Sequence, residues 1–218
     1  MQIVQNYIAG HWISGDGDGQ PLIHAISGEV FGSVSSKGLD FQSMFDYGRN
    51  VGNKNLRRMT FQQRALMLKA LALYLFDRKE RYYEVSYKTG ATRMDSWVDI
   101  ERGIGNLFAN ASLRRKLPDQ PFTIDGEYAQ LSKGGSFIGQ HILVPKLGVA
   151  LHINAFNFPV WGMLEKIAVN LLAGMPAIVK PAAITSFLTE AVFKDIIDSG
   201  ILPEGALQLV SGSAHNLI

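Results

Sequence analysis

The chain has 218 residues, no cysteine and a formal net charge of +2, with 47% hydrophobic and 18% charged residues. This length allows one large domain or two small ones with a sizeable core. The nearly balanced charge argues against a nucleic-acid or membrane surface. The lack of cysteine excludes disulfides, thiolate metal sites and a cysteine nucleophile within this chain.

No targeting or membrane-spanning segment is evident. The N-terminus lacks a basic segment followed by an apolar one, and no run of roughly 18 apolar residues occurs. We therefore expect a cytoplasmic protein without a membrane partner. The only dense basic run, Arg114–Lys116, contains no aromatic residue, so we expect a solvated helix end there and no nucleic-acid partner.

Residues 5–26 predict short strands around a turn rich in glycine and aspartate. The alternating aspartates of Gly15–Gly19 could supply oxygen ligands to calcium. The segment lacks the remaining positions and the terminal glutamate of an EF-hand loop, so we expect a plain exposed hairpin turn.

The pattern becomes helical between Leu39 and Leu117. Thr60 and Gln63 have the spacing of a capping box, and Gly90 is suited to end the helical run in a left-handed conformation. Apolar residues recur at helical spacing along this run, at Leu66, Ala70, Leu73 and Phe76. A further helix is expected over residues 95–112. Its acidic residues Asp95, Asp99 and Glu101 are predicted to form a solvated face.

Residues 121–147 change character, with several glycines, a proline near each end and β-prone pieces. We expect an antiparallel excursion from the helical layer. Such a segment either covers a neighbouring subunit or packs on its own domain.

The last third predicts a β-α-β-α-β unit. Strands are expected over 148–154, 175–181 and within 202–212. Helices are expected between them, with Pro159 in a first turn, Thr185 or Ser186 as a cap and Gly200 as a stop. Such units form a parallel sheet with right-handed crossovers, and ligands bind outside the carboxyl ends of the strands. The fold class is therefore α/β, with an N-terminal helical layer and a Rossmann-like sheet.

Polar residues follow these strand ends. Asn157 can cap local backbone, or its amide can donate to a developing oxyanion. Lys180 suits a phosphate or a ribose diol, or it is a surface lysine that covers a strand end. Gly212 would let the backbone approach a flat ligand. Asn154 has no evident mechanism, and a hydrogen bond at the strand end is the expected account.

Other chemistries find less support in the sequence. Standard dinucleotide and P-loop glycine motifs are absent. The histidines show no metal-ligand spacing, and we expect His152 to be an internal strand residue with a hydrogen bond.

The stretch "GVALHINAFNFPVWGMLEKIAVNLLAGMPAIVKPA" resembles the cofactor-domain segment of the aldehyde dehydrogenase superfamily. The usual form there is P-W-N-F-P, then a helix, then a strand that ends in K-P. "MTFQQRALMLKALA" and "TGATRMDSWVDIERGIG" resemble the branch that acts in phenylacetate degradation. The resemblance runs from "YIAGHW" to the last residue.

The resemblance implies NAD(P)-dependent oxidation of an aldehyde through a cysteine nucleophile and a glutamate that activates water. By position, Asn157 resembles the family's oxyanion-stabilising asparagine. Lys180 resembles the lysine that holds the adenosine ribose or its phosphate, and Gly212 the glycine beside the adenine. The residues that resemble the lining of the cofactor cleft are Ile153, Ala155 and Phe156.

Two departures carry information. Ala155 and Phe156 replace the usual Pro and Trp, as they do in the phenylacetate branch. Ala183 stands where many NAD-preferring members have a glutamate, which would repel a 2′-phosphate. NADP is therefore the expected cofactor.

Residues 1–120 and 148–218 are expected to form the N-terminal part of an NAD(P)-binding domain, and 121–147 an arm for homo-oligomerisation. The family's cysteine is missing, so we expect an inactive N-terminal piece of a longer enzyme without its catalytic domain. The expected substrate, by resemblance alone, is a CoA-linked semialdehyde. A stand-alone semialdehyde dehydrogenase of an aromatic-CoA pathway and a non-catalytic nucleotide-binding or scaffold module remain alternatives.

Overall fold

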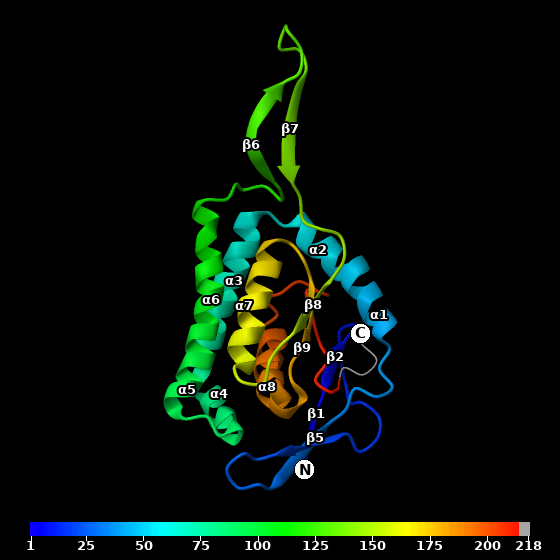
Figure 1. Ribbon diagram of the computed structural model, residues 1–218, viewed down its shortest axis with the longest axis vertical. Helices are drawn as coiled ribbons and strands as arrows, with labels where there is room; N and C mark the ends of the chain where they lie inside the picture. The colour runs from blue at the N-terminus through cyan, green and yellow to red at the C-terminus, as the bar shows by residue number, and fades with distance from the viewer. Residues whose placement is uncertain (214–218) are drawn as a thin grey trace.

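The computed structural model describes residues 1–213, and Figure 1 shows how their elements are arranged. Residues 214–218, the end of the predicted 148–218 range, lie outside the described residues. The main sheet has five strands in the order β3-β2-β10-β9-β8. Three of them run parallel to one another, namely β8 (Ala150–Ile153), β9 (Ala177–Lys180) and β10 (Leu207–Leu209).

Two helices connect these parallel strands, so the β-α-β-α-β prediction is confirmed. They are α7 (Pro159–Leu172) and α8 (Ser186–Asp198), the latter preceded by the 3₁₀ turn η5 (Ala183–Thr185). Pro159 takes the first helical position, where the N–H that it lacks would have no helical partner. Gly200 ends the segment after α8 in a left-handed conformation (φ +61°), as the sequence predicted.

A β-hairpin adds two strands to the sheet beyond β10. Its strands are β2 (Asn6–Ile8) and β3 (His11–Ile13), and β2 pairs antiparallel with β10. Ala9 and Gly10 connect them with positive φ values of 48° and 87°, which matches the twist of a two-residue hairpin.

A second, three-stranded sheet corrects the expectation for Gly15–Gly19. This sheet contains β1 (Gln2–Val4), β5 (Val30–Val34) and β4 (Gln20–Ile23), in that order. Gly15–Gly19 therefore links β3 of one sheet to β4 of the other. It is no hairpin turn, because β3 pairs with β2 and β4 pairs with β5.

The helical layer covers residues 41–115. Its elements are α1 (Phe41–Tyr47), η1 (Gly48–Gly52), α2 (Asn53–Arg58), α3 (Phe61–Phe76), α4 (Lys79–Ser86), η2 (Tyr87–Thr89), α5 (Arg93–Trp97), η3 (Val98–Arg102), α6 (Gly103–Ser112) and η4 (Leu113–Arg115). Helices α3, α6 and α7 pack against one another, and α7 contacts strands β8 and β9 (Figure 1). The basic run at Arg114 is a helix end, as expected, since the Arg114 guanidinium donates to the Ala111 carbonyl.

The capping box at the start of α3 is confirmed. The Gln63 amide donates to Thr60 Oγ1 at 3.2 Å, and the Thr60 amide donates to Gln63 Oε1 at 2.9 Å. Gly90 is left-handed with φ +81°, although the chain reaches it through separate helices α3 and α4.

The helix expected over these residues is α3, and it carries apolar residues on both faces. Leu66, Leu73 and Phe76 lie on the solvent-facing side of the helix. The residues that enter the core are Ala65, Met67, Leu68, Leu71, Ala72 and Leu75. Both faces of α3 are apolar in sequence, so spacing alone did not identify the buried one.

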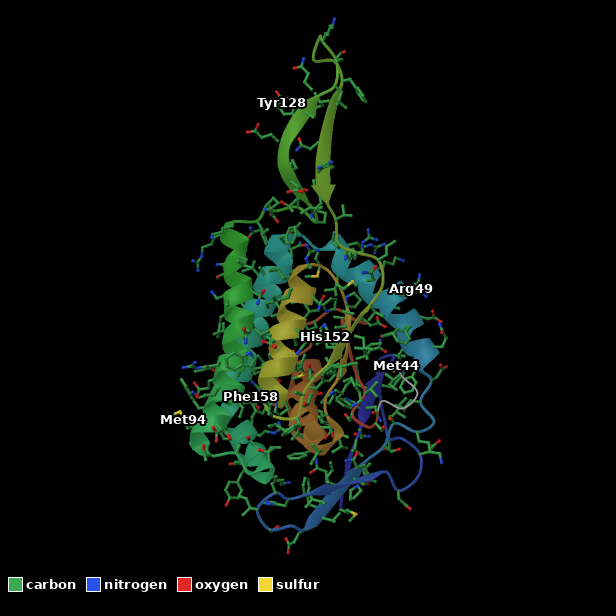
Figure 2. All side chains as sticks on the ribbon, viewed as in Figure 1. Met44, Arg49, Met94, Tyr128, His152 and Phe158 are labelled. Carbon is green, nitrogen blue, oxygen red and sulfur yellow. The ribbon has the colours of Figure 1, made fainter. Side chains whose placement is uncertain are left out.

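The expected excursion is a β-hairpin of β6 (Thr123–Gln130) and β7 (Ile138–Leu143) that pair antiparallel. Figures 1 and 2 show it extending away from the body, with Tyr128 far from the other labelled side chains. Several large apolar side chains on it are exposed, including Ile124, Tyr128, Phe137, Ile138 and Ile142. Within residues 1–213, no helix has both the length and the apolar character needed to cross a membrane.

Candidate active site

The carboxyl end of β8 leads into a short loop, residues 154–158, that presents the predicted site. Ile153, Ala155, Phe156 and Asn157 are all exposed, and Phe156 is 64% accessible. The Asn157 side chain forms no hydrogen bond within the described part of the chain, so its amide is available to a ligand.

Asn157 lines two pockets at this loop. The first, of about 310 Å³, includes Asp99, Phe156 and Thr185. The second, of about 450 Å³, includes Arg102, Trp161 and Lys166. An amide at this position can reach a ligand in either pocket.

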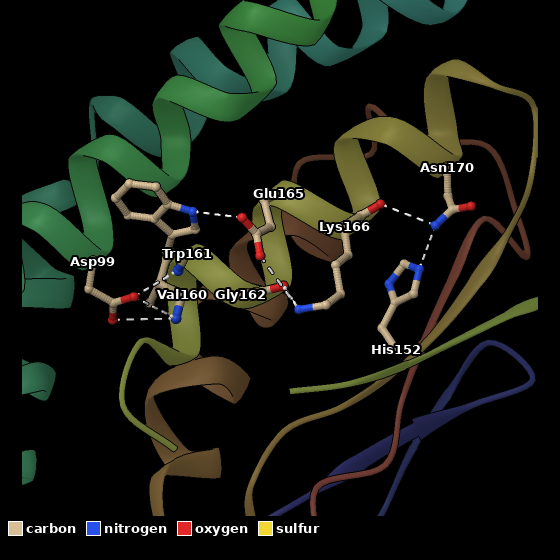
Figure 3. A network of polar contacts seen from close by, with 8 residues as sticks. All are labelled: Asp99, His152, Val160, Trp161, Gly162, Glu165, Lys166 and Asn170. Carbon is tan, nitrogen blue, oxygen red and sulfur yellow. Dashed lines mark hydrogen bonds and ion pairs between the residues drawn. The ribbon is translucent and has the colours of Figure 1, made fainter. Parts of the chain in front are cut away.

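Asp99 caps the helix that follows the loop, which corrects the prediction of a solvated acidic face. Its carboxylate accepts the Trp161 N–H at 2.7 Å and the Val160 N–H at 3.1 Å (Figure 3). Only 5% of Asp99 is exposed, and burial raises the pKa of its carboxyl group to about 6, against the opposing effect of these two backbone donors. An acid at a helix N-terminus is favourable because the free N–H groups there carry partial positive charge.

The other two acidic residues of that predicted face also have partners. Glu101 accepts hydrogen bonds from Lys79 at 2.9 Å and from Tyr83 at 2.7 Å. Asp95 is exposed, and it forms a capping box with Thr92 at the start of α5. Asp95 therefore caps its own helix, whereas Asp99 and Glu101 bind groups on α7 and α4.

Asn154 is buried, with 5% of its surface exposed, and neither atom of its side-chain amide has a partner in the described residues. Only its backbone bonds at the strand end, where the N–H donates to the Lys180 carbonyl at 2.9 Å. The expected hydrogen bond is thus made by the main chain and not by the side chain.

Lys180 is buried at the end of β9, so it is no surface lysine. Its ammonium donates to the Pro181 carbonyl, and no carboxylate pairs with it among the described residues. Burial lowers the pKa of its ammonium group to about 8, because the charged form is less well solvated. Ala183 follows in η5 with a partly buried side chain.

The structure explains in a further way why position 212 is a glycine, which the sequence did not show. A Cβ at this position would lie 2.3 Å from the Ser36 N and 2.5 Å from the Ser35 carbonyl carbon. The glycine is therefore needed for close packing against the segment after β5, whatever ligand binds nearby.

Thr185 precedes α8 as predicted, but its side chain does not cap that helix. The hydroxyl donates to the Phe156 carbonyl at 3.3 Å and so reaches the loop after β8. Ser186 Oγ donates to the Ala183 carbonyl and does not cap α8 either.

A polar network runs along α7 from this site (Figure 3). The Trp161 indole donates to Glu165 at 2.8 Å, and Lys166 donates to the Gly162 carbonyl at 3.1 Å. Further along, Asn170 Nδ2 lies 2.6 Å from His152 Nε2, which confirms an internal, hydrogen-bonded histidine. Sequence reasoning missed Asp99, Thr185 and Lys166 as neighbours of Asn157.

Comparison with known proteins decides the family. The sequence model of the Aldehyde dehydrogenase family matches residues 12–217. The chain belongs to the aldehyde dehydrogenase family. It is 38% identical to the 3,4-dehydroadipyl-CoA semialdehyde dehydrogenase of Aromatoleum evansii, over 98% of this chain and 42% of that protein.

Solved aldehyde dehydrogenases confirm the fold. A putative aldehyde dehydrogenase from Bacillus subtilis superposes with a TM-score of 0.82 at 20% identity, over 97% of this chain and 45% of the other. A betaine aldehyde dehydrogenase from Staphylococcus aureus in complex with NAD+ gives a TM-score of 0.76 at 22% identity, over 97% and 41%. The chain thus spans less than half the length of these aldehyde dehydrogenases.

Proposed function

We propose that this chain is the N-terminal, NADP-binding part of an aldehyde dehydrogenase, in which Asn157 donates to the oxyanion that forms on the aldehyde. The observation that best supports this proposal is the Asn157 side-chain amide. It is exposed, forms no hydrogen bond within the described residues, and lines two pockets at the carboxyl end of a parallel strand. One donor of this kind typically changes the rate by about 100- to 1000-fold. Residues 1–120 and 148–218 would form the cofactor domain.

The cofactor proposal depends on Lys180. Among the described residues this buried cation has one backbone acceptor and no carboxylate partner, so it can pair with a phosphate. Ala183, three residues later, adds no negative charge that would repel a 2′-phosphate. Ile153, Ala155 and Phe156 would face the cofactor, which accepts a hydride from the substrate when bound. NADP is proposed over NAD on these grounds.

Titration of the 218-residue chain with NADP and NAD tests this proposal. We expect tighter binding of NADP, and a loss of about 10- to 100-fold in NADP affinity for Lys180→Ala. Lys69→Ala, at an exposed position on α3, is the matched control and should bind as the unmodified chain does. Equal or tighter binding of NAD would overturn the choice of cofactor.

The substrate proposal is a CoA-linked semialdehyde of phenylacetate-type aromatic degradation in the cytoplasm. It is supported by the relative from Aromatoleum evansii, whose name specifies a CoA semialdehyde. A stand-alone semialdehyde dehydrogenase of an aromatic-CoA pathway is the alternative within the family. Assays of the complete gene product on CoA-linked and free aldehydes, with a search for a hydratase activity, distinguish the two.

The lack of cysteine favours one further possibility, a nucleotide-binding or scaffold module without chemistry. We propose instead that chemistry needs a cysteine and a glutamate supplied outside these residues. The purified 218-residue chain should therefore oxidise no aldehyde. Turnover by this chain alone would contradict the proposal.

We also propose that the β6–β7 hairpin of the 121–147 segment joins copies of this chain in a homo-oligomer. Its exposed apolar side chains, such as Tyr128 and Phe137, have no cover within the described residues. Sedimentation should give a smaller mass for the complete protein when a short turn replaces residues 123–143. An unchanged mass would exclude this role.

A further inference from the structure

The backbone on both sides of Asn157 is held by hydrogen bonds. On one side, the Phe156 carbonyl accepts the Thr185 hydroxyl at 3.3 Å. On the other, the Phe158 carbonyl accepts the Gly162 N–H at 2.8 Å, within the first turn of α7. The orientation of Asn157 therefore depends on what fixes Thr185 and what fixes the start of α7.

The start of α7 has no local cap. Phe158 occupies the N-cap position and has no side-chain acceptor, and Pro159 has no N–H. The next two N–H groups, of Val160 and Trp161, would be unpaired without Asp99. Asp99 comes from η3, about 60 residues earlier in the sequence, and accepts both of them (Figure 3).

Asp99, Thr185 and Asn157 line the same pocket, so the two anchors approach the loop from different elements of the fold. Asp99 belongs to the helical layer and Thr185 to the turn between β9 and α8. We infer that Asp99 and Thr185 are positioning residues, which together hold the loop so that the Asn157 amide points at the reacting carbonyl oxygen. The inference rests on the proposed role of Asn157 as the donor to that oxygen.

Within residues 1–213, Asp99 forms no ion pair that would explain its position in another way. The two backbone N–H groups are its hydrogen-bond donors in the described residues. Charged or titratable side chains on η3 and on the helices packed against it include Asp95 of α5, Glu101 and Arg102 of η3, Lys79 and Tyr83 of α4, and Glu165 and Lys166 of α7. Lys79 and Tyr83 are both bonded to Glu101, and Lys166 lies 3.6 Å from Glu165.

The first test uses the 218-residue chain and needs no turnover. Burial raises the pKa of the Asp99 carboxyl group to about 6, so the amide resonances of Val160 and Trp161 should titrate with a midpoint near pH 6. Asp99→Asn keeps an acceptor but removes the charge, and should abolish this titration while the chain stays folded. Asp119→Asn, at an exposed loop position, is the matched control and should leave it unchanged.

The same spectra test the link to Asn157. Asp99→Ala should speed amide exchange of Trp161 at least about tenfold and broaden or shift the side-chain amide resonance of Asn157. Thr185→Val should disturb the Asn157 resonance from the other side, and Thr185→Ser, which keeps the hydroxyl, should restore it. If the Asn157 resonance is unchanged in both Asp99→Ala and Thr185→Val, the two residues are structural caps and the inference fails.

The kinetic test uses the complete enzyme that contains this chain. Asp99→Ala and Thr185→Val should lower kcat about tenfold or more with little change in the KM for NADP, whereas Lys180→Ala should raise that KM. A change confined to KM would overturn the inference. If the chain does not bind NADP but the Asn157 resonance responds to Asp99→Ala and Thr185→Val as expected, the proposed cofactor is wrong, while the two residues still hold the loop in position.

Discussion

The Tyr82 hydroxyl donates a 2.8 Å hydrogen bond to Asp195 Oδ2 and thereby ties α4 to α8. Both residues are buried, while the Arg81 guanidinium reaches the other oxygen of Asp195 at 2.9 Å. Burial, and then the neighbouring carboxylate, raises the pKa of the Tyr82 phenol above its usual range, so the hydroxyl remains a donor at all physiological pH values.

Tyr82→Phe should therefore destabilise the chain. It leaves one oxygen of a buried carboxylate without its donor, which costs about 1–3 kcal/mol in the free energy of unfolding. Urea denaturation measures the difference. Tyr87→Phe is the matched control, because Tyr87 is largely exposed and should tolerate the change within about 0.5 kcal/mol. Equal effects of the two substitutions would exclude this role for the hydrogen bond.

Arg64 is a buried cation that binds three backbone carbonyls. Its guanidinium donates to Leu172 and Met59, each at 2.7 Å, and to Leu56 at 3.1 Å. Burial lowers the pKa of this guanidinium to about 10. Arg64→Lys should reduce the free energy of unfolding by about 2 kcal/mol, since a single ammonium group cannot reproduce the planar set of donors.

Arg49→Lys provides the comparison for Arg64, because Arg49 is an exposed arginine with no ion pair in the described residues. It should change stability by less than about 0.5 kcal/mol. If Arg64→Lys is equally well tolerated, the three carbonyls have other donors available.

His152 should make the chain sensitive to acid. Burial, with a smaller effect from Lys166, lowers the pKa of its imidazole to about 4, and Nε2 acts as an acceptor for Asn170. The unfolded chain, with an ordinary histidine pKa of 6.5, binds more protons between pH 4 and 6.5. Stability is therefore lost as the pH falls through this range, by up to about 3 kcal/mol.

Asp99 opposes this effect over nearly the same range. Its pKa is raised to about 6, so the folded chain binds the extra proton and gains stability as the pH falls from 6 to 4. Asp99→Asn should thus steepen the acid loss, and His152→Gln, which keeps an acceptor, should reduce it. Urea denaturation at pH 7, 5.5 and 4.5 separates the two. His141→Gln on the exposed hairpin should match the unmodified chain at every pH.

Gly212→Ala should be strongly destabilising, because its Cβ would overlap the Ser35–Ser36 backbone. We expect a loss of about 1–3 kcal/mol or more in the free energy of unfolding. The matched control is Gly105→Ala in α6, where nothing lies within 4 Å of the added Cβ. That control should be neutral or stabilising by up to about 1 kcal/mol. A tolerated Gly212→Ala would show that the two segments separate easily.

The features that the sequence predicted are those set by residues close along the chain. The Thr60–Gln63 capping box, the left-handed Gly90 and the first-turn Pro159 each depend on a few neighbouring positions. The β-α-β-α-β order follows in the same way, from alternating strand and helix patterns with short links.

The features that the sequence did not predict depend on distant packing. Asp99 looked like a surface acid, because its helix N-terminus lies about 60 residues away. Sequence spacing did not show which face of α3 is buried, since the exposed Leu66 and the buried Leu68 are equally apolar. Likewise, the contact that Gly212 makes with Ser36 is invisible in a local pattern. The role of Asn157 and the choice of NADP remain predictions for the binding and kinetic tests.

The position of β8 at the end of the strand order has a consequence for experiments in solution. β8 bonds to β9 through alternate residues, so the peptide groups of Leu151 and Ile153 point to a side with no neighbouring strand in residues 1–213. An unpaired edge of this kind is a template for another strand. This edge therefore offers a route to self-association of the isolated chain that is separate from the one proposed for the hairpin. A proline at Leu151 would block the first without touching the second.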